Sequence, residues 1–200
     1  MNKKAILTGS IALLFISISL QPISAEMTST QNMELQEAAM IEKFIDDWFK
    51  AGSKPYLYEI GKDEKVKHNE QVSYYLKSIN KIEDGFGNIM RQIIPDEYRG
   101  KRIKLTGTIK SENIDNWAGM WMRVDGPEPG KSLQFDNMQN RPIKGSNEWT
   151  NYEIVLDVPE NSTGIAYGVL VSGNGQIWFS SLSFEVVGTD VPSTNIQKEE

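Results

Sequence analysis

The segment 133–149, LQFDNMQNRPIKGSNEW, gathers side chains that bind polar ligands. Asp136, Asn137 and Arg141 follow one another closely, and Trp149 ends the segment. Carboxylate, amide and guanidinium groups form hydrogen bonds with hydroxyl groups, and an aromatic face packs on C–H surfaces. The combination favours a ligand that is rich in hydroxyl groups.

A second group of such residues lies in GMWMRVDG (119–126), which alternates as a strand does. Trp121, Arg123 and Asp125 share one side of this predicted strand. We expect it to pair with a strand that ends near Asp136, which would bring the two groups into one pocket. The predicted ligand-binding residues are Trp117, Trp121, Arg123, Asp125, Gln134, Asp136, Asn137 and Arg141.

The same residues could instead serve structure alone. Arg123, Asp136 and Arg141 can form ion pairs, and Asn137 can cap a turn, all to hold a long loop. Trp117 suits either an exposed stacking platform or a lid on one end of a core. The other three tryptophans outside the pocket, Trp48, Trp149 and Trp178, are expected in the core.

The sequence contains few features of a catalytic site, and we predict that the protein is not an enzyme. His68 is the only histidine and there are no cysteines, which argues against a transition-metal site. No G-x-S-x-G motif accompanies His68, so a hydrolase triad is not indicated. Asp125, Asp136 and Glu153 could pair as glycosidase carboxylates do, but a chain with 27 acidic residues offers such pairs by chance.

Elements that could position these residues are predicted to be strands. KRIKLTGTIKSE (101–112) gives the clearest alternation, with apolar residues on one face and Lys or Thr on the other. Short strands at even spacing, without alternating helices, predict an all-β antiparallel sandwich of the jelly-roll type. The further predicted strands are 56–61, 72–79, 86–95, 119–126, 151–159, 164–173 and 176–188.

The beginning of the chain has a different texture. Residues 1–25 carry a basic start, an apolar run and a small-residue end, which predicts a secretory signal peptide and no stable membrane anchor after its cleavage. Residues 26–47 are predicted to hold a flexible stretch and an amphipathic helix, and Trp48 either ends that helix or opens the first strand. The sandwich should span 48–188, and the polar tail 189–200 should be disordered.

The net charge of the chain restricts the classes of partner that it is expected to bind. The chain has a net charge of −6, which becomes −8 once the two lysines Lys3 and Lys4 are removed with the signal peptide. An acidic chain without a basic block is a poor candidate for nucleic acid, because neutralisation of phosphates dominates that affinity. The absence of cysteine excludes disulfides and thiolate metal sites.

The order of these motifs resembles the galactose-binding-like jelly rolls, which include many carbohydrate-binding modules. The resemblance rests on RGKRIKLTGTIKSE, WAGMWMRVD, the W-x-x-Y-E-I-V-L-D-V-P stretch and the final strand with IWF. GMWMRVDG, FDNMQNRPIKG and YEIVLDVP also resemble a bacterial module that occurs alone or fused to helix-turn-helix regulators. The carbohydrate-binding modules of the galactose-binding-like type often end in a W-x-D-D strand, whose Asp can help to hold a structural calcium. Ser180 and Ser181 stand there, which argues against that ion, and no other cofactor is indicated.

These observations lead to three hypotheses for a secreted protein. The first is a non-catalytic module that binds carbohydrate or cell-wall glycan. The second is an extracellular protein-interaction or sensor module, which the amphipathic helix favours because it could dock on a partner. The third is a small glycoside hydrolase, whose carboxylates the sequence does not single out.

Overall fold

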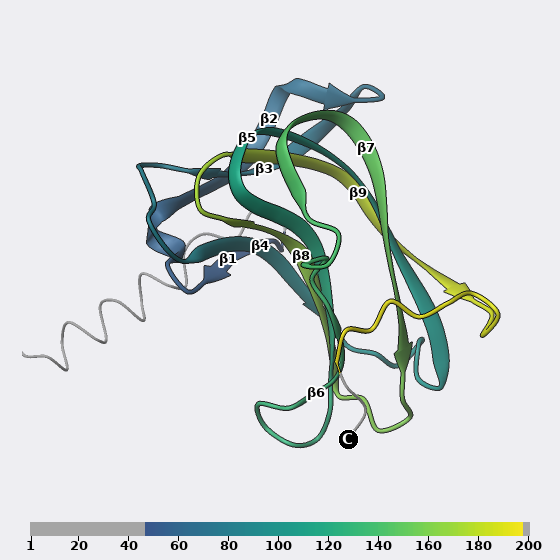
Figure 1. Ribbon diagram of the computed structural model, residues 1–200. Helices are drawn as coiled ribbons and strands as arrows, with labels where there is room; N and C mark the ends of the chain where they lie inside the picture. Colours follow the sequence, from purple (N-terminus) through teal and green to yellow (C-terminus); the bar gives the residue numbers. More distant parts are fainter. Residues whose placement is uncertain (1–46, 198–200) are drawn as a thin grey trace, which may run out of the picture.

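The computed structural model of the protein describes residues 47–197, which form antiparallel β-structure (Figure 1). The predicted all-β antiparallel class is confirmed for these residues. Its elements are β1 (Phe49–Gly52), the 3-10 turn η1 (Pro55–Leu57), β2 (Tyr58–His68), β3 (Gln71–Ser78), β4 (Phe86–Ile93), β5 (Lys101–Asp125), β6 (Ser132–Asp136), β7 (Ile143–Val158), β8 (Gly164–Ser172) and β9 (Gln176–Val187).

One long strand, β5, belongs to both layers of the sandwich. Its first half, 101–112, pairs with β7 and β9, and its second half, 117–125, pairs with β8 and β6. The sheet runs β1-β4-β8-β5-β9-β3-β2, so it curls over on itself about β5 (Figure 1). The two strands that the sequence predicted at 101–112 and 119–126 are therefore one, and left-handed Asn113 (φ 55°) lies between them.

Alternating apolar residues of β5, β7, β8 and β9 fill the space between the layers. Trp48 precedes β1 and is buried there, in contact with the rings of Tyr167 and Phe179 at centroid distances of 5.7 and 5.0 Å. Trp48 therefore lies directly at the start of the first strand and in the core. This agrees with the alternative that it opens that strand. The Arg91 guanidinium lies 4.5 Å from the centre of the Trp48 ring.

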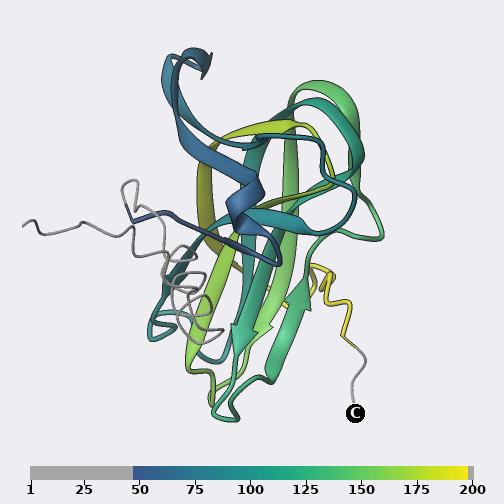
Figure 2. The same ribbon diagram turned by 90° about the vertical axis from the view of Figure 1, so that its left-hand side faces the viewer.

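Two hairpin strands are longer than the sequence predicted. β2 continues through the polar stretch GKDEKVKH, and with its partner β3 it projects beyond the rest of the sandwich (blue, top of Figure 2). β7 starts at Ile143, eight residues before the predicted strand at 151–159. Residues of these extensions are wet on both sides, so they lack the period-two pattern by which a half-buried strand is recognised.

The tail beyond β9 is ordered as far as Gln197, although its composition predicts disorder from residue 189. The Thr194 N–H donates to the Val155 carbonyl at 2.8 Å, and the Ile196 N–H donates to the Phe135 carbonyl at 2.9 Å. The tail thus bonds to β7 and to β6, which are edge strands of the two layers (yellow, Figure 1). Hydrogen bonds of its backbone, and not the burial of apolar side chains, hold this segment in place.

The predicted signal peptide and amphipathic helix lie outside the described residues. Among residues 47–197 we find no helix with the length and hydrophobicity that crossing a membrane requires.

Candidate functional site

The polar cluster of the segment 136–141 is a structural clamp. Asp136 ends β6 opposite Met122, a core residue, so its carboxylate points inward and is fully buried. Both of its oxygens accept hydrogen bonds from Arg141, at 2.6 and 3.1 Å, and one also accepts from the Met138 N–H at 2.8 Å. The Asn137 side chain accepts from the Gln139 N–H at 3.1 Å. Asp136, Asn137 and Arg141 therefore hold the turn between β6 and β7.

Arg123 and Asp125 lie on the outer face of β5, as alternation predicts. Arg123 donates two hydrogen bonds to Asp125, at 2.7 and 3.2 Å, which fixes both side chains in one plane. Phe135, which the sequence analysis did not select, is the cross-strand partner of Arg123. Residues directly opposite each other in an antiparallel pair share a face, so the ring of Phe135 lies beside the ion pair.

These three residues line a hollow of about 470 Å³ under the loop that joins β5 and β6. The loop supplies an acid, a base and a hydroxyl group, from Glu128, Lys131 and Ser132. The hollow therefore combines one aromatic wall with several hydrogen-bonding groups that the hairpin holds in place.

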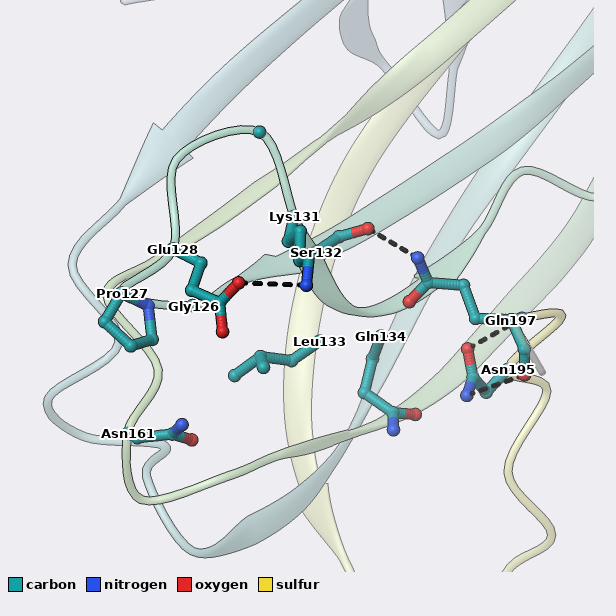
Figure 3. Close-up of a pocket in the computed structure, with 11 residues that line it drawn as sticks. Gly126, Pro127, Glu128, Lys131, Ser132, Leu133, Gln134, Asn161, Asn195 and Gln197 are labelled. Carbon is teal, nitrogen blue, oxygen red and sulfur yellow. Dashed lines mark hydrogen bonds and ion pairs between the residues drawn. The ribbon is translucent and has the colours of Figure 1, made fainter. Parts of the chain in front are cut away.

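A second hollow of about 620 Å³ lies at the same loop and shares part of its lining with the first (Figure 3). Gln134 from β6, Asn161 from the β7–β8 turn, and Asn195 and Gln197 from the tail all face it. Gln197 donates to the Ser132 hydroxyl at 2.6 Å, which ties the tail to the hairpin. Among the described residues, the side chains of Gln134 and Asn161 have no hydrogen-bond partner, so their amides are available to a ligand.

Trp117 and Trp121 share the outer face with Arg123, but they belong to an apolar cluster. Trp121 is 5% exposed and packs with Met90, Ala166 and Leu170, while half-buried Trp117 packs at the edge of that cluster. The structure thus brings Trp121, Arg123 and Asp125 to one face and places Gln134 nearby. It turns Asp136 away from that face.

A third surface lies on the outer side of the other layer. Trp178 is buried there and donates its indole N–H to Asp63 at 2.9 Å, outside the main core in which it was expected. Trp149 is only half-buried and contacts the His68 ring at 5.1 Å, which corrects the expectation of a core residue. A hollow of about 560 Å³ nearby is lined mainly by hydroxyl and amide side chains, with Glu153.

The pKa of Asp63 is shifted by its surroundings at this surface. The Val66 N–H, followed by the Trp178 indole and the Lys65 N–H, holds the pKa of Asp63 below its usual value against the opposing effect of burial. No group of three or more His, Cys, Asp or Glu side chains in the described part of the chain is arranged to hold a metal ion.

Solved structures with the same architecture were found by comparison. The enzymatically active domain of bacteriophage CBA120 tailspike protein 4 matches 72% of this chain and 20% of its own, at 16% identity and a TM-score of 0.54. The CBM22-1 xylan-binding domain of Paenibacillus barcinonensis Xyn10C matches 74% of this chain and 90% of its own, at 10% identity and a TM-score of 0.52. The chain has the fold of a carbohydrate-binding module. At these identities the likeness concerns the fold alone.

Sequence comparison gives a nearer relative. An uncharacterized HTH-type transcriptional regulator of Bacillus subtilis, YbfP, is 44% identical over 163 residues, which is 81% of this chain. The chain spans about half of that relative, 55% of its length. No family model matches the chain.

Proposed function

We propose that the protein is an exported, non-catalytic module that binds carbohydrate or cell-wall glycan at the β5–β6 hairpin. The observation that carries this proposal is the hollow in which the Phe135 ring lies beside the Arg123–Asp125 ion pair. Sugars combine a C–H face with paired hydroxyl groups, and this hollow offers a partner to each. The fold shared with a xylan-binding domain supports the proposal.

The ion pair suits this role because it is formed before any ligand arrives. Arg123 and Asp125 hold each other in position, so less side-chain entropy is lost when hydroxyl groups bind to them. Gln134 and Asn161 extend the surface to the second hollow at the hairpin loop. A chain of several sugar units could therefore contact both hollows, whereas a monosaccharide would occupy one.

The placement of the carboxylates supports the proposed non-catalytic role. Asp136 is fully buried in its ion pair with Arg141, and Asp125 is bonded to Arg123. Glu153 is exposed on β7. None of these three is presented to a shared cavity as a free acid and base, which glycosidic cleavage requires.

A glycan array, followed by calorimetry on any hit, tests the proposal. The wild-type protein should bind a defined polysaccharide class, with and without calcium. Phe135→Ala and Arg123→Ala should each weaken binding about tenfold, which is the loss of about 1.4 kcal/mol. Glu153→Gln, at the hollow of the other layer, is the matched control and should bind like the wild type.

Two results would count against this site. Binding that only Glu153→Gln weakens would move the glycan to the other layer. Silence of the folded protein across the array would reject carbohydrate as the ligand. Mass spectrometry of protein recovered from the culture medium, with a new N-terminus at residue 26, would test the proposed export.

A sensor or protein-interaction module is the second candidate. The observation that favours it is the relative described as a transcriptional regulator, of which the matching stretch is about half. In such a protein, a module of this fold would bind a ligand or a partner, and another part of the protein would respond to that binding. Capture of a protein partner by the wild type but not by Arg123→Ala, together with a silent glycan array, would support this role.

A further inference from the structure

The outer face of one layer carries an apolar cluster of its own. The strands β1, β4, β8, the second half of β5, and β6 lie in this order across the face. Their core-facing side chains belong to the main core, and the side chains on the opposite face form this outer cluster. Its members are Phe49, Ala51, Met90, Trp117, Trp121, Phe135, Ala166 and Leu170.

This outer cluster is buried, although every one of its described members comes from the sheet itself. Trp121 is 5%, Leu170 6% and Met90 8% exposed. A sheet face that is open to water leaves large apolar side chains partly solvated, and monomeric proteins rarely leave such a patch uncovered. Burial of this kind calls for a covering layer, which the strands of this face do not supply themselves.

Two polar atoms on the same face point to the same conclusion. The Trp121 Nε1–H and the Asn88 Oδ1 are buried and have no hydrogen-bond partner within the described part of the chain. Asn88 lies in register between Ala51 and Leu170, so its side chain is on this face. Buried polar atoms are nearly always paired, and a covering segment with backbone or side-chain polar groups can pair both.

We propose that residues 34–46 of the same chain cover this face as an amphipathic helix. The stretch repeats apolar residues at three- and four-residue spacing, with Glu and Lys between them. The residues of this stripe are Leu35, Ala38, Ile41, Phe44 and Ile45.

The point of attachment favours this segment. It ends one residue before Asp47, which has a left-handed backbone (φ 67°), as residues that follow a helix often do. Phe49, two residues later, is already a member of the outer cluster and lies on edge strand β1. Covalent attachment at the edge of the face gives the segment a high effective concentration there, which a second copy or a separate partner lacks.

The dimensions also agree. A 13-residue helix is about 20 Å long. Five strands at about 4.8 Å spacing are about 19 Å across, so the helix can reach from β1 to β6. The match to the relative covers 163 residues of this chain, whereas residues 47–197 number 151 and only three residues follow them. At least nine matched residues therefore precede Asp47, so the match extends into the region before β1, where the segment 34–46 has thirteen residues.

The outer cluster and the Arg123–Asp125 hollow adjoin at Phe135, which belongs to both. The covering of the face does not depend on glycan binding. The experiment uses the full chain as the host processes it, with its N-terminus checked by mass spectrometry. Ile41→Asp and Phe44→Asp place a charge on the apolar stripe. Gln36→Asp adds the same charge on the opposite side of the helix and is the matched control.

The readout is the solvent exchange of the Trp121 indole N–H by NMR, assigned with Trp121→Phe. We expect exchange to become at least tenfold faster in both stripe variants, while Gln36→Asp and the core amides of β8 keep wild-type protection. If a stripe variant fails to fold, Ile41→Ala and Phe44→Ala should still accelerate the exchange severalfold.

Unchanged exchange in folded stripe variants would overturn the proposal, as would equal acceleration in Gln36→Asp. Protection that is lost on dilution, with a dimer mass by light scattering, would show that a second copy covers the face and would also overturn it. The exchange is measured without glycan, so its outcome is distinguishable from that of the glycan array.

Discussion

Arg141 and Asp136 form a two-point ion pair in which the carboxylate is fully buried and the guanidinium reaches it from the surface. This geometry ties the turn after β6 to the core, and it removes from the surface the acid that seemed best placed to bind a ligand. Breaking the pair leaves either a buried charge without a partner or a void in place of the carboxylate.

Asp136→Ala should therefore lower the free energy of unfolding by about 3 kcal/mol. Urea unfolding followed by far-UV circular dichroism measures this change. Arg123→Ala is the control, because its ion pair with Asp125 is partly exposed and should contribute less than about 1 kcal/mol. Loss of glycan binding in Asp136→Ala at unchanged stability would contradict the structural role.

Trp121→Ala should destabilise the protein by about 3 kcal/mol, because a large buried ring leaves a cavity. The sequence analysis placed Trp121 among the ligand-binding residues, but its burial makes any loss of binding in this variant inseparable from the loss of stability. Half-buried Trp149, which contacts His68, provides the comparison, and Trp149→Ala should cost about 1 kcal/mol. Equal stability of Trp121→Ala and the wild type would refute this prediction.

Asp63 should make the packing of the β2–β3 hairpin depend on pH. Its folded-state pKa lies below the usual value of an aspartate carboxyl, so the stability that it contributes is complete above that usual value. The contribution is lost as the pH falls through the lower, folded-state pKa. Trp178 fluorescence, titrated from pH 6 to pH 2, should report the change. Asp63→Asn should remove this transition, whereas Glu64→Gln, at an exposed neighbour, should retain it.

Removing the tail after Gly188 should make the protein associate. The tail bonds to the edge strands β6 and β7, and an exposed edge strand is a template for pairing with another chain. Light scattering should show particles that grow with protein concentration. A chain shortened only by residues 198–200 is the control and should stay like the wild type. A monodisperse chain ending at Gly188 would show that these edges need no cover.

Strands with one wet face were predictable from the sequence. The stretch at 101–112 and the later part of 176–188 alternate because one side packs on the core and the other meets water. The extensions of β2 and β7 were missed because both of their sides are solvated. The continuity of β5 through 113–118 was missed because its pairing changes there from one layer to the other.

The candidate site was predictable where alternation applies. Arg123 and Asp125 share a face for that reason, and Phe135 could have been found by pairing it with Arg123. The inward turn of Asp136 could not, because a carboxylate opposite core residue Met122 breaks the apolar pattern. Tail residues Asn195 and Gln197 reach the hairpin through tertiary contacts that local sequence does not encode.

The passage of β5 through both layers also governs how the domain folds and how it unfolds under force. Arg102 pairs with Val187, far along the chain, and Asp125 pairs with Gly164. Such non-local pairing gives a high contact order, so folding should take milliseconds to seconds. Since β5 is hydrogen-bonded to strands of both layers, a pulling force on the termini should unfold both layers in one event. No intermediate that has lost only one layer is expected.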